Sequence, residues 1–201
     1  MHDELTDPIV RYQGDFDLSL SADAVERLCA YYEILLEHNT ILHLVAPCSA
    51  EEFAIRHVLE PLMLLRHLPE NEKFADVGSG GGTPSLPCLL VRQDLKAVLI
   101  ESKEKKAAFL LEAVSRLGLG RRVTVVGRQF EEADITGCGS VTCRALDKFA
   151  ERLPRILRWA GKRRMLLFGG PNLAEALRSL NVRFGSELMP LSDRRYLFSS
   201  G

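Results

Sequence analysis

The chain has 201 residues, a formal net charge of −1 and 46% hydrophobic residues. This length and composition predict a single soluble globular domain with a sizeable core, and they exclude a low-complexity chain. The sequence has no long apolar run, and its start is acidic and polar. We therefore expect neither a transmembrane helix nor a signal peptide. The five cysteines are scattered without a Cys-x-x-Cys pair, which indicates reduced thiols, a cytoplasmic protein and no zinc.

The charge is distributed unevenly along the chain. Residues 1–72 carry 4 basic and 14 acidic side chains, residues 73–139 carry 10 and 8, and residues 140–201 carry 12 and 5. The three segments therefore have charges of −10, +2 and +7, which add up to −1. This asymmetry allows a basic face on the C-terminal half, although clustering by chance on a solvated surface is the alternative.

The expected elements begin with two helices. The first spans 22–38 after Ser21, and the second runs from 50 to about 67 after a capping box formed by Ser49 and Glu52. Strands are expected at 73–77, 96–101, 123–127, 140–144 and 163–168. Helices are expected between and after them, at 84–92, 103–117, 148–160 and 172–180.

Segments 184–189 and 194–198 are expected to add an antiparallel pair at the edge of the sheet. Alternating strands and helices predict an α/β fold with a mostly parallel sheet and helices on both faces. We therefore expect a Rossmann-like fold with seven strands. A helical lead-in over 1–70 precedes the main unit over 71–201.

The loop after the first expected strand is the most informative stretch. Asp76, Gly78, Gly80 and Gly82 are spaced as acid-x-Gly-x-Gly-x-Gly. Glycines permit a tight turn and let a ligand lie against the main chain, and the following helix start offers unpaired N–H groups. The dinucleotide fingerprint of a nicotinamide-dependent oxidoreductase fits less well, because its third glycine place holds Thr83. The full pattern resembles the first motif of methyltransferases that use S-adenosylmethionine.

Polar side chains also follow the later strands. Glu101 ends the second strand about twenty residues past the loop, where Rossmann-like sites hold ribose hydroxyls. The alternative role of Glu101 is to cap the next helix. Asp76, Glu101, Arg128 and Arg144 all fall at the carboxyl ends of strands, and they should meet in one crevice.

Arg144 directly follows a buried strand, which is costly unless it faces a ligand or an acid. A salt bridge to Asp147 or Glu101 is the alternative. Thr142-Cys143 copies the nucleophile dipeptide of RNA cytosine-C5 methyltransferases, but a buried strand cysteine is the simpler interpretation. His43 and His57 lie in the lead-in, and either could face the crevice, although an isolated histidine is usually structural.

The chain resembles the ribosomal small-subunit methyltransferase G family, also called glucose-inhibited division protein B. Residues 76–87 resemble its signature D-x-G-S/T-G-x-G-x-P-G-I-P, and residues 101–110 resemble its D-S-x-x-K-R-x-x-F-L run. Residues 126–128 and 142–145 resemble its G-R-A-E and S-R-A segments, and residues 56–62 resemble more weakly its K-H-x-x-D-S-L helix.

The resemblance implies a class I methyltransferase that transfers a methyl group from S-adenosylmethionine to N7 of a guanine in 16S ribosomal RNA. It implies a monomer that acts on small-subunit ribosomal RNA or the 30S particle, without a metal. Arg144 and Asn39 are the catalytic candidates. The cofactor candidates are Asp76, Gly78, Gly80, Gly82, Thr83, Glu101, Gln129, Phe130 and Arg144. Guanine N7 has a free lone pair, so the transfer depends on orientation and needs no strong base.

The RNA-binding candidates are basic residues near expected helix starts: Lys105, Lys106, Lys148 and Arg152. Cations at a helix start oppose its dipole, which hints at phosphate contact, and plain solvated lysines are the alternative. The chain also departs from the family pattern at His43, Val45, Gln129, Phe130 and near Phe168, where the family has a lysine. These departures leave open a divergent S-adenosylmethionine-binding protein with an altered substrate or no catalysis.

Overall fold

The computed structural model describes residues 2–144 and 148–200, and its centre is a seven-stranded sheet of order β3-β2-β1-β4-β5-β7-β6. The strands are β1 (Lys73–Val77), β2 (Lys96–Ile100), β3 (Val123–Val126), β4 (Ser140–Arg144), β5 (Arg164–Gly169), β6 (Gly185–Leu188) and β7 (Tyr196–Ser199). The first five pair in parallel, whereas β7 runs antiparallel to both β5 and β6. The predicted mostly parallel sheet and its antiparallel edge pair are confirmed.

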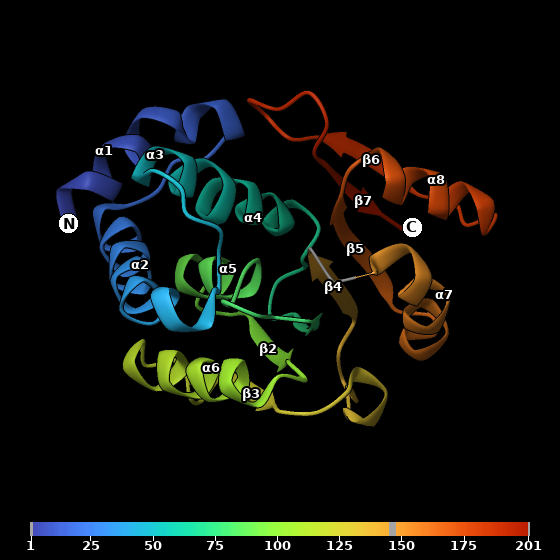
Figure 1. Ribbon diagram of the computed structural model, residues 1–201. Helices are drawn as coiled ribbons and strands as arrows, with labels where there is room; N and C mark the ends of the chain where they lie inside the picture. The colour runs from blue at the N-terminus through green and yellow to red at the C-terminus, as the bar shows by residue number, and fades with distance from the viewer. Residues whose placement is uncertain (1, 145–147, 201) are drawn as a thin grey trace.

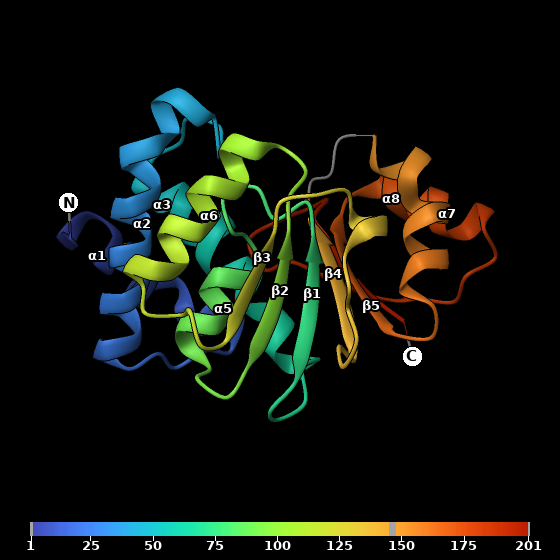
Figure 2. The ribbon, with the colours of Figure 1, turned by 90° about the horizontal axis from the view of Figure 1, so that it is seen from below.

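Helices cover both faces of the sheet, as predicted (Figure 2). They are α5 (Ser85–Val91), α6 (Glu104–Arg116), α7 (Phe149–Ala160) and α8 (Pro171–Ser179). Successive strand residues point to opposite faces, so Phe74 packs in one apolar cluster with α5 and α6, whereas Ala75 packs in another with α7 and α8. The sheet is therefore buried on both sides.

The lead-in contains one helix more than the sequence predicts. The expected helix after Ser21 is α2 (Ala22–Leu42), and the Ser21 Oγ accepts from the Ala24 N–H at 3.2 Å. The additional helix is α1 (His2–Tyr12), which buries Leu5 and Ile9 completely. Pro8 inside it and the acidic residues around it hide its apolar stripe in the sequence.

The second predicted lead-in helix is continuous but changes its winding. It consists of α3 (Ala50–Phe53), the π-helical η2 (Ala54–Leu59), α4 (Glu60–Leu62) and the 3₁₀ turn η3 (Met63–Arg66). The predicted cap at Ser49 is confirmed, because its Oγ accepts from the Glu52 N–H at 3.1 Å. π-Helical turns are rare and are frequently found at functional sites.

The lead-in shares one core with the sheet. Leu5 and Tyr31 from the lead-in belong to the same buried cluster as Phe74 and Leu99 from the strands. Figure 1 shows the blue and teal lead-in helices packed together beside α5. The boundary at residue 70 remains a prediction. None of the helices in the described ranges has the length and apolar character needed to cross a membrane.

If α1 is part of this core, Ile9→Ala will destabilise the protein by about 2–5 kcal/mol, because it leaves a cavity at a fully buried position. The matched control is Val10→Ala in the same helix, where the side chain is 53% exposed and the expected loss is within about 0.5 kcal/mol. Urea unfolding of the two variants measures the difference. Equal, small effects would mean that α1 does not contribute to the stability of the fold.

Candidate active site

A cleft of about 600 Å³ lies at the carboxyl ends of the parallel strands. Each of these strands contributes the residues at its end: Gly78–Gly81 after β1, Glu101–Lys103 after β2, Arg128–Phe130 after β3, Arg144 on β4, and Gly169 and Gly170 at β5. Figure 2 shows the arrowheads of β1 and β2 pointing to the same edge of the sheet. The volume suits a ligand of cofactor size.

The glycine loop is fixed to the neighbouring strand. Gly78 and Gly80 have φ angles of 74° and 53°, a region that glycine enters without strain. The N–H groups of Gly78 and Ser79 donate to the Ile100 carbonyl at 2.8 and 3.1 Å, and the Gly80 N–H donates to Glu101 Oε2 at 3.0 Å. The loop therefore presents its main chain to the cleft in a defined conformation.

Glu101 lies at the junction of the glycine loop and α6. Its Oε1 accepts from the Lys103 N–H at 2.8 Å, which caps the start of α6, and its Oε2 accepts from Gly80. The residue lines the cleft while it is 7% exposed. Because each carboxylate oxygen has two acceptor positions, both oxygens can accept a further hydrogen bond from a hydroxyl group.

Asp76 and Gly82 lie beneath the loop, not in the cleft. Asp76 is fully buried and accepts from the Ser85 Oγ at 2.7 Å, and burial raises the pKa of its carboxyl to about 7. A Cβ at Gly82 would collide with Leu86 on α5. Neither residue lines the cleft. In this structure the two residues join the loop to α5, and the geometry does not support direct cofactor contact by either of them.

Arg144 lines the cleft, and among the described residues its acidic partner is Glu60, whereas Glu101 was one of the two expected partners. Its Nη2 donates to Glu60 Oε2 at 3.5 Å, and its guanidinium lies 5.6 Å from the centre of the Phe168 ring. Burial lowers its pKa to about 10, against the opposing effect of the Glu60 carboxylate. Asp147, the other expected partner, lies outside the described residues.

The lead-in supplies a wall of the cleft on which His57 is the one residue that the sequence marks as able to face the crevice. Arg56, His57 and Glu60 line the cleft from η2 and α4, and Arg195 joins them from the segment before β7. Burial, followed by the charges of Arg144 and Arg56, lowers the pKa of His57 to about 3, so this ring is neutral at pH 7. The other sequence signal for this wall is the weak family resemblance of residues 56–62.

Three further cofactor candidates, Thr83, Gln129 and Phe130, line the cleft. Asn39 does not line the cleft. Its Oδ1 instead accepts from the Val45 N–H at 2.9 Å, which holds the loop after α2. Its catalytic role is therefore not supported by the geometry. Cys143 is fully buried in β4 and does not line the cleft either, which agrees with a structural strand cysteine.

The four RNA-binding candidates divide into two pairs. Lys106 and Arg152 line the cleft. Lys105 lies instead on an adjoining groove of about 420 Å³ that also includes His43, and Lys148 is exposed outside both. Burial lowers the pKa of Lys106, whose Nζ donates to the His43 carbonyl at 3.2 Å.

The cleft is strongly positive although the whole chain is not. Among the described residues that line it, seven are cationic and two are acidic. The acids are Glu60 and Glu101, and the cations are Arg56, Lys103, Lys106, Arg128, Arg144, Arg152 and Arg195. Such a concentration of one charge in a concave site favours an anionic partner.

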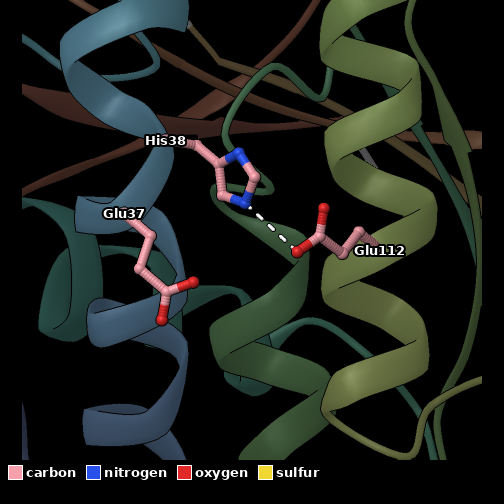
Figure 3. Close-up of side chains that lie close together, drawn as sticks. All are labelled: Glu37, His38 and Glu112. Carbon is pink, nitrogen blue, oxygen red and sulfur yellow. Dashed lines mark hydrogen bonds and ion pairs between the residues drawn. The ribbon is translucent and has the colours of Figure 1, made fainter.

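The described residues also include one set of potential metal ligands outside the cleft: Glu37, His38 and Glu112 (Figure 3). His38 Nε2 lies 3.2 Å from Glu112 Oε1. Arg116 already provides the positive charge here, because its Nη1 lies 2.5 Å from Glu37 Oε2 and 3.3 Å from Glu112 Oε1. A metal ion would have to displace that guanidinium, so we assign no metal to this cluster.

Asp76 gives a test of the buried carboxyl. Its pKa is raised by burial, so the stability it contributes is complete below its unfolded pKa and is lost as the pH rises towards about 7. Asp76→Asn should therefore gain melting temperature relative to the unmodified protein from about pH 4 to about pH 7, and the difference should then level off. The exposed Asp15→Asn is the control, and a pH-independent difference for Asp76→Asn would contradict the assignment.

Comparisons with known proteins agree with this site. The family model of GidB, described as rRNA small subunit methyltransferase G, matches residues 24–183. A ribosomal RNA small subunit methyltransferase G of Neisseria meningitidis serogroup C is 35% identical over 144 residues, which are 72% of this chain and 67% of that protein. The protein of the same name from Halorhodospira halophila is 36% identical over 140 residues, 70% and 66% of the two chains. The chain thus spans about two thirds of the length of these relatives.

Solved structures show the same fold at low sequence identity. The N-terminal domain of human METTL16, in complex with SAH, has a TM-score of 0.57 at 13% identity and covers 98% of this chain and 94% of its own. The Bacillus subtilis tRNA methyltransferase TrmK has a TM-score of 0.54 at 16% identity, covering 73% and 68%. The predicted class I methyltransferase fold is confirmed, and the alternative prediction of a nicotinamide-dependent oxidoreductase is wrong. The chain belongs to the rRNA small subunit methyltransferase G family, a family of S-adenosylmethionine-dependent enzymes.

Proposed function

We propose that this protein transfers a methyl group from S-adenosylmethionine to N7 of a guanine in small-subunit ribosomal RNA. The observation that carries the proposal is the cleft itself, in which seven cations surround a glycine loop at the carboxyl ends of the strands. The substrate form is the 30S particle or its assembly intermediates, and the protein acts as a monomer in the cytoplasm.

The residues present fit the cofactor. The Glu101 carboxylate lines the cleft and can accept hydrogen bonds from two sugar hydroxyls, and the loop from Gly78 to Gly81 offers main chain that a ligand can approach closely. Gln129 and Phe130 form the neighbouring wall, where the largely buried Phe130 ring is held edge-on by Trp159 at 5.3 Å between ring centres. When bound, the cofactor supplies an electrophilic methyl group on a sulfonium.

The chain's own contribution is orientation and charge. Guanine N7 carries a lone pair and loses no proton, so the neutral His57 and the absence of a strong base among the described cleft residues are compatible with this reaction. Arg128, Arg152 and Lys106 lie where they can neutralise phosphates of the RNA on either side of the target. Glu60 and Glu101 temper the positive field in which the base becomes cationic.

The direct test maps methylation in ribosomal RNA from a strain that lacks the gene. The expected result is one unmodified guanine, which regains its N7 methyl group when purified protein and S-adenosylmethionine are added to 30S particles from that strain. Deproteinised RNA as substrate separates a requirement for the particle from a requirement for the RNA. Unchanged modification everywhere would favour the alternative of a divergent S-adenosylmethionine-binding protein without catalysis.

Gly80→Asp should weaken S-adenosylmethionine binding by at least about 100-fold, measured by calorimetry. Asp tolerates the φ of 53°, and its Cβ would meet only the Gly78 carbonyl at 3.7 Å, so the fold should persist while the carboxylate occupies the cleft. Gly137→Asp is the matched control, because Gly137 has a φ of 79° and open space around it outside the cleft. Full affinity in Gly80→Asp would mean that the cofactor does not lie against this loop.

Lys106→Gln combined with Arg152→Gln should lower the affinity for RNA and reduce the slope of log K against log salt by about one to two, because two phosphate contacts are lost. The control changes Lys96 and Lys162, both exposed at the opposite edge of the sheet, to Gln. Filter binding over a series of salt concentrations measures both. If the two double variants behave alike, the RNA does not enter through the cleft.

A further inference from the structure

We propose that Glu60 is a positioning residue, whose buried carboxylate holds the guanidinium groups of Arg144 and Arg195 in fixed orientations on the wall of the cleft. The consequence for catalysis rests on the function proposed above. The contacts of Glu60 with the two arginines do not depend on that function.

Glu60 joins three segments that are distant in the sequence. It is the first residue of α4, directly after the π-helical η2, and it is 1% exposed. Its Oε1 accepts from Arg195 Nε at 2.6 Å, and its Oε2 accepts from Arg144 Nη2 at 3.5 Å. Arg144 ends β4, and Arg195 lies just before β7. One carboxylate thus ties the lead-in to the centre of the sheet and to its antiparallel edge.

The two arginines reach Glu60 from backbones that are themselves held. The Arg195 N–H donates to Ser192 Oγ at 3.1 Å, and the Arg195 carbonyl accepts from the Met189 N–H at 2.8 Å. Arg144 pairs in register with Phe168, whose ring it also faces. Each guanidinium therefore has one fixed end, and Glu60 provides the second point that defines its direction.

Stability alone does not account for this arrangement. Burying a carboxylate costs more than a simple ion pair returns, and apolar replacements of buried ion pairs are often neutral or stabilising. Burial raises the pKa of Glu60, while Arg144 and Arg195 act in the opposite direction. Because Glu60, Arg144 and Arg195 all line the cleft, this costly ion-pair cluster is better explained by a role in orienting the two arginines.

Glu60 also sets the charge at this end of the cleft. The groups around it are Arg56, Arg144 and Arg195, together with the neutral His57. With Glu60 ionised the net charge of these groups is +2, and without the charge of Glu60 it is +3. The site would then attract RNA at least as strongly, but it would oppose the positive charge that methylation places on the base. Loss of the carboxylate should therefore lower kcat and leave KM for RNA unchanged or lower.

The first test does not require turnover. In ¹⁵N-arginine spectra, the Nε–H of Arg195 should exchange slowly with solvent in the unmodified protein and at least about tenfold faster in Glu60→Gln, because a charged hydrogen bond is lost. Glu60→Asp should lie between the two. Glu187→Gln, which removes the ion pair between Arg66 Nη1 and Glu187 Oε2 at 3.6 Å outside the cleft, should leave the Arg195 signal unchanged. Equal exchange in Glu60→Gln and the unmodified protein would overturn the proposal.

The second test measures methyl transfer with the same variants. The expected result for Glu60→Gln is a kcat at least about tenfold lower with KM for RNA not raised, with partial recovery in Glu60→Asp. Glu187→Gln should retain kcat. A loss of kcat in Glu60→Gln that only parallels its loss of melting temperature would assign Glu60 to stability instead. If the unmodified protein also fails to methylate RNA, the proposed function is at fault, and the arginine exchange still decides the role of Glu60.

Discussion

The parallel pairing of β1 with β2 and β4 is the constraint on which the cleft depends. In this register Val77 lies beside Ile100 on one side and Cys143 on the other, so the residues that follow these strands meet at one edge. Glu101 thereby contacts the glycine loop, and Arg144 lines the same cleft as the loop. The hydrogen bonds from Gly78 and Ser79 to the Ile100 carbonyl then fix the loop on β2, so the sheet determines the geometry of the site.

The lead-in closes the cleft from the other side. The Tyr31 hydroxyl on α2 donates to the Gly81 carbonyl at 2.8 Å, and a Cβ at Gly81 would lie 3.2 Å from Leu44 and 3.4 Å from Leu35. A larger residue would push α2 and its following loop away from the glycine turn. The lead-in and the sheet therefore fit together at the glycine loop, and a displacement of the lead-in would alter the cleft more directly than the sheet.

Sequence patterns predicted β2 and β4 well because each is a largely buried apolar run that leads directly into a charged residue, Glu101 after β2 and Arg144 at the end of β4. The same patterns failed where contacts between distant segments decide. Glu60 and Arg195 are 135 residues apart, and nothing local in either segment indicates the other. The position of the Asp76 side chain could not be predicted for a related reason, because the motif gives its spacing from the glycines but not the direction of its side chain. Alternation along β1 turns the carboxyl towards Ser85 and away from the cleft.

The net charge of the chain likewise does not predict the charge of the cleft. The first 72 residues carry 14 acidic side chains, yet Glu60 alone among those that the structure describes lines the cleft. Helical packing directs the other acids elsewhere, while the ends of β3 and β4 bring the cations Arg128 and Arg144 to the common edge. An overall charge of −1 therefore coexists with a cleft of seven cations and two acids, and long-range repulsion between the acidic lead-in and an RNA is offset where the two would meet. Selectivity then depends on the local field, which is why the one acid that the lead-in does place among the arginines matters.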